Sequence, residues 1–274
     1  LANNFSESNL NKTRVEIEID WIIFLTTQGG KNFKSLSAAA KKNLLKIKLG
    51  FDDRSAKKIK AIESRTNHDV KAVEYFIRDE MSKYSNLKKY QHLVHFALTS
   101  EDINSLSYAV LLRNAIDIYL KKLNALIKDL GTKSKSWASI PVLARTHGQA
   151  ASPSSLGKEI KVFHHRLSRQ KNILKKMKPL AKFGGATGNF HTLDLADSGI
   201  DWLSKTKKFL SLFRVDQNPM TTQIEPHDGI AEISHCIQRI NNILIDLNQD
   251  MWIYISNDIF KLKLKDGEIG SSTM

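Results

Sequence analysis

Apolar residues recur at steps of three and four over three long stretches of this chain, and this spacing limits its possible folds more than any other feature. The stretches are 112–130, 156–174 and 233–254. A period near 3.6 places such residues on one face of an α-helix. Seams of this length are typical of long helices that pack nearly side by side. The sequence therefore predicts an all-α fold, with apolar edges that favour an oligomer.

Residues 1–90 follow a different pattern, because polar breaks such as Gly29-Gly30 and 50–53 separate shorter apolar segments. The stretch 15–20 alternates apolar and acidic residues, which by itself indicates a strand. No partner strand is evident nearby in the sequence, so we predict a helix there. We place a domain boundary near Lys88, with a small N-terminal helical domain at 1–88 and a long-helix bundle domain at 89–274.

Composition narrows the classes of function. With 274 residues, 41% of them hydrophobic, the chain can bury a large core. Its single cysteine, Cys236, excludes an internal disulfide framework and a cysteine-based zinc cluster, and favours an intracellular, cytoplasmic location. No H-E-x-x-H pair occurs, and no apolar run approaches the roughly 20 residues of a membrane helix. We therefore predict neither a bound metal nor contact with a membrane.

The formal net charge of +14 indicates an anionic partner, such as nucleic acid or a small anionic substrate. The basic residues are dispersed, and the densest run, 171–182, has no aromatic residues on which bases could stack until Phe183 follows it. We interpret that run as a solvated helix face. A small anionic substrate is therefore the preferred partner, and a nucleic-acid binder is the alternative.

Polar and glycine-rich segments interrupt the helical pattern, and binding and catalytic residues often lie on such loops. The segments are 66–69, 98–102, 145–149, 184–189, 221–228 and 267–274.

Two of these segments precede expected helices. Thr99 and Ser100 are followed by Asp102, a pattern that caps a helix and also presents N–H groups and hydroxyls to an anion. Asn67 or Asp69 has the residue type of a cap, whereas His68 lies at the helix entry and outside the apolar face. Each segment therefore admits both a structural and a binding interpretation.

Two further segments are less specific. His147 is a loop histidine, so it is either structural or a proton donor and acceptor. The segment 184–189 is rich in glycine but lacks the lysine and spacing of a Walker loop, so we predict a tight turn. The final segment, 267–274, has the composition of a mobile lid and equally of a frayed terminus.

Taken together, these segments resemble the aspartase/fumarase superfamily and, within it, the adenylosuccinate lyases of the bacterial type. The matching runs are N-H-D-V-K-A-V-E-Y at 67–75, H-F-A-L-T-S-E-D-I-N at 95–104, T-H-G-Q at 146–149, T-T-Q-I-E-P-H-D at 221–228, and G-S-S-T-M at 270–274. The last run matches the first half of the superfamily signature. Several long matches in the same order are far more specific than any one alone.

The resemblance implies a reaction and a set of roles. The family cleaves adenylosuccinate to AMP and fumarate, and succinyl-aminoimidazole-carboxamide ribotide in the same way, in purine biosynthesis without a cofactor. By this resemblance His147 is the general acid and Ser271 the general base. The residues implied to bind substrate are Asn67, His68, Asp69, Thr99, Ser100, Thr146 and Gln223.

The resemblance also implies a cytoplasmic homotetramer with sites shared between subunits. It implies three domains, of which we expect this chain to hold the first and most of the second, shortened at its start and within the signature loop. The family's N-terminal Arg-Tyr motif and the rest of the signature have no match here. The alternatives are another fumarate-releasing lyase, such as argininosuccinate lyase or fumarase, and a non-catalytic basic helical scaffold or nucleic-acid binder.

Overall fold

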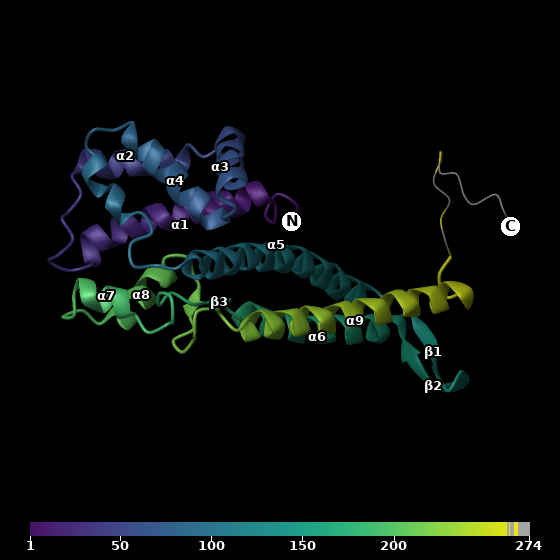
Figure 1. Ribbon diagram of the computed structural model, residues 1–274. Coiled ribbons are helices and arrows are strands. Elements are labelled where there is room, and N and C mark those ends of the chain that lie inside the picture. Colours follow the sequence, from purple (N-terminus) through teal and green to yellow (C-terminus); the bar gives the residue numbers. More distant parts are fainter. Residues whose placement is uncertain (262, 264–265, 268–274) are drawn as a thin grey trace. The chain divides into compact units, whose positions relative to one another are not determined.

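The computed structural model describes residues 1–261, 263 and 266–267, and Ser271 therefore lies outside the described residues. The described chain is mainly helical, which confirms the predicted all-α fold (Figure 1). It divides into two compact units, Leu1–Lys121 with Met177–Ile233, and Lys122–Lys176 with Ser234–Met274. The domain boundary expected near Lys88 falls inside the first unit and stays a prediction.

The N-terminal part of the first unit consists of helices, several of which begin where a polar side chain caps them. The Ser6, Ser37 and Asp52 side chains each accept the backbone N–H three residues further on, which satisfies donors that have no partner within the helix. The elements are α1 (Glu7–Gln28), α2 (Ala38–Leu49), α3 (Asp53–Thr66), α4 (Asp69–Ser82) and the 3-10 helix η1 (Lys88–Leu93).

Helix α1 contains the stretch 15–20, and the predicted helix is confirmed there. Val15, Ile17 and Ile19 are all fully buried, although an α-helix points them in different directions. The reason is that α2, α3, α4 and α8 (Trp202–Ser211) all contact α1. A helix surrounded by other elements carries apolar residues on several faces, so its pattern loses the usual helical period.

An aromatic cluster forms the centre of the first unit. The ring of Trp21 lies 5.1 Å from the rings of both Phe183 and Phe209, between centroids, and stacks on Phe24 at 5.7 Å. The cluster holds α1 against α8 and against the segment that follows β3 (Leu180–Ala181). Strand β3 pairs in parallel with β4 (Asp216–Gln217), and α7 (His191–Ala196) lies between them in sequence.

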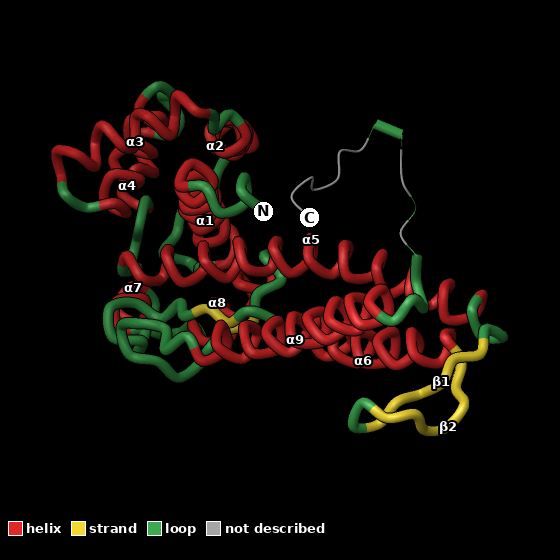
Figure 2. Tube along the Cα trace, turned by 90° about the vertical axis from the view of Figure 1, so that its right-hand side faces the viewer, coloured by secondary structure: helices red, strands yellow, loops and turns green. Residues whose placement is uncertain are grey.

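The three predicted apolar seams form three long helices. They are α5 (Ser100–Ser136), α6 (Leu156–Lys176) and α9 (Asp228–Ser256). Within the second unit, Figure 2 shows α6 and α9 side by side, and Arg166 of α6 pairs with Asp246 of α9 at 2.7 Å. Seam residues such as Leu130, Leu167 and Ile240 are at most 6% exposed.

A β-hairpin in the second unit was not predicted. Its strands are β1 (Pro141–Thr146) and β2 (Gln149–Ser155), and they pair antiparallel with an irregularity between Leu143 and Arg145. Alanine, serine and proline dominate β2, so propensity gives little sign of a strand. Within the described residues, no helix is both long and apolar enough to cross a membrane.

Candidate active site

Asn67, His68 and Asp69 form the junction between α3 and α4. Asn67 ends α3 with φ at 49°, in the left-handed region that asparagine tolerates. The Nδ1 atom of His68 accepts the backbone N–H of Lys71 at 3.2 Å, so His68 is the N-cap of α4. The expectation that Asn67 or Asp69 caps this helix is therefore wrong, because the His68 ring takes that position.

The same three residues line a cavity of about 590 Å³, together with Lys60, Glu63 and Ser64. The carboxylate of Asp69 accepts a hydrogen bond from Arg14 at 2.6 Å. Burial raises the pKa of Asp69, but the Arg14 charge and hydrogen bonds outweigh it and hold the pKa below its ordinary value. Asp69 therefore stays ionised at neutral pH, and its half-exposed side chain faces solvent beside His68.

A second group of candidates lies at the start of α5. Thr99 and Ser100 are half-buried there. The backbone N–H of Thr99 donates to the Asp102 carboxylate at 2.8 Å, so Asp102 supports the first turn as predicted. The first turn also carries Glu101 and Asp102. Its remaining N–H groups and the helix dipole favour an anion near Thr99 and Ser100.

Asp102 is fully buried and pairs with Lys182 at 2.7 Å. The Lys182 side chain is only 1% exposed, so the interpretation of the whole run 171–182 as solvated is wrong for Lys182. The physical reason is that α6 ends at Lys176, and the chain then enters β3 and turns inward. A buried lysine requires a compensating charge, which Asp102 supplies.

The glycine segment 184–189 is a tight turn, as predicted, and it packs against the segment of Gln223. Gly185 and Gly188 adopt φ near 79° and 78°. A Cβ at Gly188 would lie 2.3 Å from the carbonyl oxygen of Thr221, so only glycine fits. This close approach places the turn beside the exposed Gln223. Within that segment, the buried carboxylate of Glu225 accepts the N–H of His227 at 2.6 Å.

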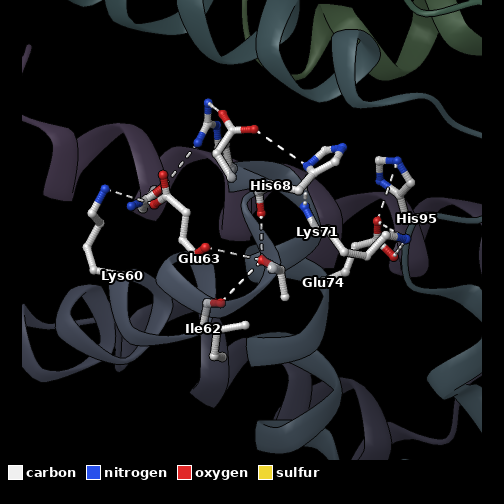
Figure 3. A network of polar contacts seen from close by, with 11 residues as sticks. Lys60, Ile62, Glu63, His68, Lys71, Glu74 and His95 are labelled. Carbon is white, nitrogen blue, oxygen red and sulfur yellow. Dashed lines mark hydrogen bonds and ion pairs between the residues drawn. The ribbon is translucent and has the colours of Figure 1, made fainter.

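Figure 3 shows a polar network that connects α4 with the loop before Thr99, and sequence reasoning missed it. The Nδ1 atom of His95 lies 2.6 Å from the fully buried carboxylate of Glu18, and its Nε2 atom lies 3.8 Å from Glu74. Lys71 of α4 pairs with Glu74 at 2.8 Å. The network thus joins the helix that His68 caps to the loop that leads to Thr99. The only signal in the sequence was that His95 begins one of the matching runs.

This network predicts a pH-dependent contribution to stability. Burial lowers the pKa of His95, but the hydrogen bond and charge of Glu18, with the charge of Glu74, outweigh it and raise the pKa above its ordinary value near 6.5. A raised folded-state pKa stabilises the fold fully below the unfolded pKa, and this contribution is lost as pH rises through the folded pKa.

We therefore expect His95→Gln to destabilise the protein more at pH 6 than at pH 9, as measured by urea unfolding at both values. The exposed His92→Gln serves as control, and its effect should be small at both pH values. An equal loss for His95→Gln at both pH values would contradict the charged state of His95.

Thr146 and His147 belong to the second unit, whereas the other described candidates lie in the first. Both are exposed, at the turn of the β1–β2 hairpin. His147 and Gly148 have φ of 53° and 74°, the two positive values that a tight two-residue hairpin turn requires. The structure therefore presents the His147 ring at a loop tip.

Among the described residues, no group of three or more histidine, cysteine, aspartate or glutamate side chains is placed to hold a metal ion.

The first unit thus contains hydroxyls at a helix N-terminus, a glycine turn and a half-exposed histidine, each of which is a group that can bind an anion. Comparison with known proteins identifies its class. Residues 1–274 match the family model described as "Lyase", and the chain belongs to this family. The resemblance predicted from the motifs is thereby confirmed.

Adenylosuccinate lyases are among the curated proteins most similar to this chain. The chain is 42% identical over 275 residues to that of Escherichia coli K12, covering 98% of this chain. It is 42% identical over 278 residues to that of Buchnera aphidicola subsp. Schizaphis graminum, covering 100%. The chain spans 60% of the length of these two relatives.

Solved structures show the fold. A fumarate lyase from Mesorhizobium sp. BNC1 superposes with a TM-score of 0.76 at 16% identity, over 94% of this chain and 57% of that one. A 3-carboxy-cis,cis-muconate lactonizing enzyme from Pseudomonas putida gives 0.74 at 17% identity, over 93% and 56%. The predicted fumarase/aspartase-like fold is therefore confirmed.

Proposed function

We propose that the full-length protein is an adenylosuccinate lyase, which eliminates fumarate from adenylosuccinate to leave AMP and acts likewise on succinyl-aminoimidazole-carboxamide ribotide. The observation that carries the proposal is the 42% identity to adenylosuccinate lyases over 98% of this chain. The described candidate residues support it, because each lies on a loop or at the end of a helix or strand. A formal charge of +14 also suits substrates that carry phosphate and carboxylates.

The proposed reaction is a β-elimination with two proton transfers. A base removes a proton from the carbon next to the C–N bond, the electron pair forms the double bond of fumarate, and the C–N bond breaks. An acid then protonates the leaving nitrogen. We assign the base to Ser271 and the acid to His147, whose ring is exposed at the hairpin turn.

The remaining candidates bind the substrate in this proposal. Thr99 and Ser100 hold a carboxylate or the phosphate, since the N-terminus of a helix favours an anion through its N–H groups and dipole, and both residues lie at the start of α5. Asn67, His68 and Asp69 contribute through the cavity that they line. Thr146 and Gln223 complete the nucleotide and succinyl pockets, and both are exposed at loop positions. The reaction as proposed uses side chains alone, with no cofactor.

We further propose a cytoplasmic homotetramer in which several subunits contribute to each site, with neither nucleic acid nor membrane as partner. Large apolar side chains of the second unit support such assembly, because they are too exposed for a lone subunit. Leu143 is 51% exposed, Ile245 59% and Trp252 74%. Large apolar side chains exposed to this degree are enriched at protein interfaces.

The test is to follow fumarate release by the full-length protein with three substrates at equal concentration. We expect turnover of adenylosuccinate and none of argininosuccinate or malate. Turnover of argininosuccinate alone would show that the protein is an argininosuccinate lyase and not an adenylosuccinate lyase. If all three stay unreacted while the protein binds a random DNA duplex with strong salt dependence, the proposal is wrong.

A further inference from the structure

One buried carboxylate joins two segments of the candidate site that lie about 80 residues apart in sequence. The Asp102 side chain accepts the N–H groups of Thr99 at 2.8 Å, Gly184 at 3.0 Å and Gly185 at 3.1 Å. Its separations from the two glycines are 82 and 83 residues. Asp102 thus ties the start of α5 to the glycine turn.

Lys182 completes this arrangement from the other side. Its Nζ atom lies 2.7 Å from Asp102 Oδ1 and also donates to the carbonyl oxygen of Gly185. Its backbone N–H donates to Ser105 Oγ of α5 at 2.9 Å. Both members of the pair are at most 1% exposed, so water does not screen their interaction.

The pair is an expensive way to stabilise a fold, because removing two charges from water offsets most of their attraction. Apolar residues of the same size stabilise a core at least as well, but they cannot accept three backbone N–H groups at once. What the pair adds is therefore geometry. The pair fixes the position of Thr99 relative to the turn 184–188. Gly188 of this turn packs closely against the backbone of Thr221, two residues before Gln223.

We propose that Asp102 and Lys182 are positioning residues for substrate binding. They hold Thr99 and Ser100 in register with the glycine turn and the Gln223 segment, so that these groups meet the anionic substrate together. The inference rests on the proposed lyase function, and it assigns neither residue contact with the substrate. The groups that they position bind the substrate equally in the ground state and in the transition state. Loss of this positioning therefore changes KM more than kcat.

The experiment replaces Lys182 with methionine in the full-length protein, which keeps the length of the side chain and removes its charge. With adenylosuccinate as substrate, we expect KM to rise about tenfold or more, the effect of losing one charge-assisted hydrogen bond, while kcat stays close to that of the unaltered enzyme. Lys178→Met is the matched control, because Lys178 is 59% exposed and pairs with Asp216 at the surface.

A second variant guards against failure to fold, since Lys182→Met leaves the Asp102 charge buried and unpaired. Asp102→Asn combined with Lys182→Met removes both charges and should fold, yet it should show the same increase in KM. Hydrogen exchange of peptides that contain Thr99 and Gly184–Gly185 gives a readout that needs no activity. We expect both peptides to exchange faster together, while peptides of α1 keep their protection.

The outcomes separate the two proposals. A raised KM with faster exchange at both segments supports the positioning role. A KM within the range of Lys178→Met, or faster exchange at only one segment, overturns it. If the unaltered enzyme lacks lyase activity, the proposed function fails, and exchange alone decides whether the pair couples the two segments.

Discussion

Replacing Ser271 with alanine in the full-length enzyme is expected to abolish turnover of adenylosuccinate while substrate binding survives. Ser271 lies outside the described residues, and its role rests on the match of 270–274 to the superfamily signature. The expected loss is complete because no other group in the proposed reaction removes the carbon-bound proton. Steady-state fumarate release and calorimetric titration with adenylosuccinate would measure the two effects separately.

The matched control is the adjacent serine, Ser272. A serine hydroxyl acts as a base only where its surroundings stabilise the alkoxide, so two neighbouring serines are not interchangeable. Ser272→Ala should therefore retain much of the activity. If Ser272→Ala abolishes turnover and Ser271→Ala does not, the base has been assigned to the wrong serine.

Replacing His147 with alanine is expected to lower kcat by roughly 10² or more, the usual contribution of a positioned general acid. The leaving nitrogen then departs without a proton from the enzyme, which raises the barrier for C–N cleavage. The fold should be unaffected, because the His147 side chain is exposed at the hairpin turn. Steady-state kinetics with adenylosuccinate, together with a thermal unfolding curve, would measure both properties.

His165→Ala provides the comparison for this variant. His165 is an exposed histidine of α6 in the same compact unit, and the proposed reaction does not use it. Its replacement should leave kcat unchanged. Unimpaired turnover by His147→Ala would remove His147 from the mechanism, whereas equal losses for both histidines would point to a general effect on the unit.

The helices could be predicted from the sequence because each seam carries its own period. The stretches that became α5, α6 and α9 needed no knowledge of their partners. Residues 15–20 were harder, since burial on several sides of α1 hides the helical period. The hairpin could not be predicted, because β2 lacks the β-branched and aromatic residues that favour strands. The two strands pair around the turn between Thr146 and Gln149.

The candidate residues could be predicted as segments but not as a connected site. His95 and Glu18 are 77 residues apart in sequence, and Asp102 and Gly184 are 82 apart. No local pattern shows that such groups meet. Lys182 illustrates the cause of error, because a lysine in a basic run has the same sequence signature whether it is solvated or paired in the interior. Only the tertiary structure separates the two states.

The most direct test of the proposed function is a mass balance on purified full-length protein with adenylosuccinate. Chromatography would quantify the remaining substrate, AMP and fumarate over one time course. We predict that AMP and fumarate appear in equal amounts as adenylosuccinate is consumed. Failure to consume adenylosuccinate, or its consumption without equal amounts of AMP and fumarate, would contradict the assignment of this chain to a fumarate-releasing nucleotide lyase.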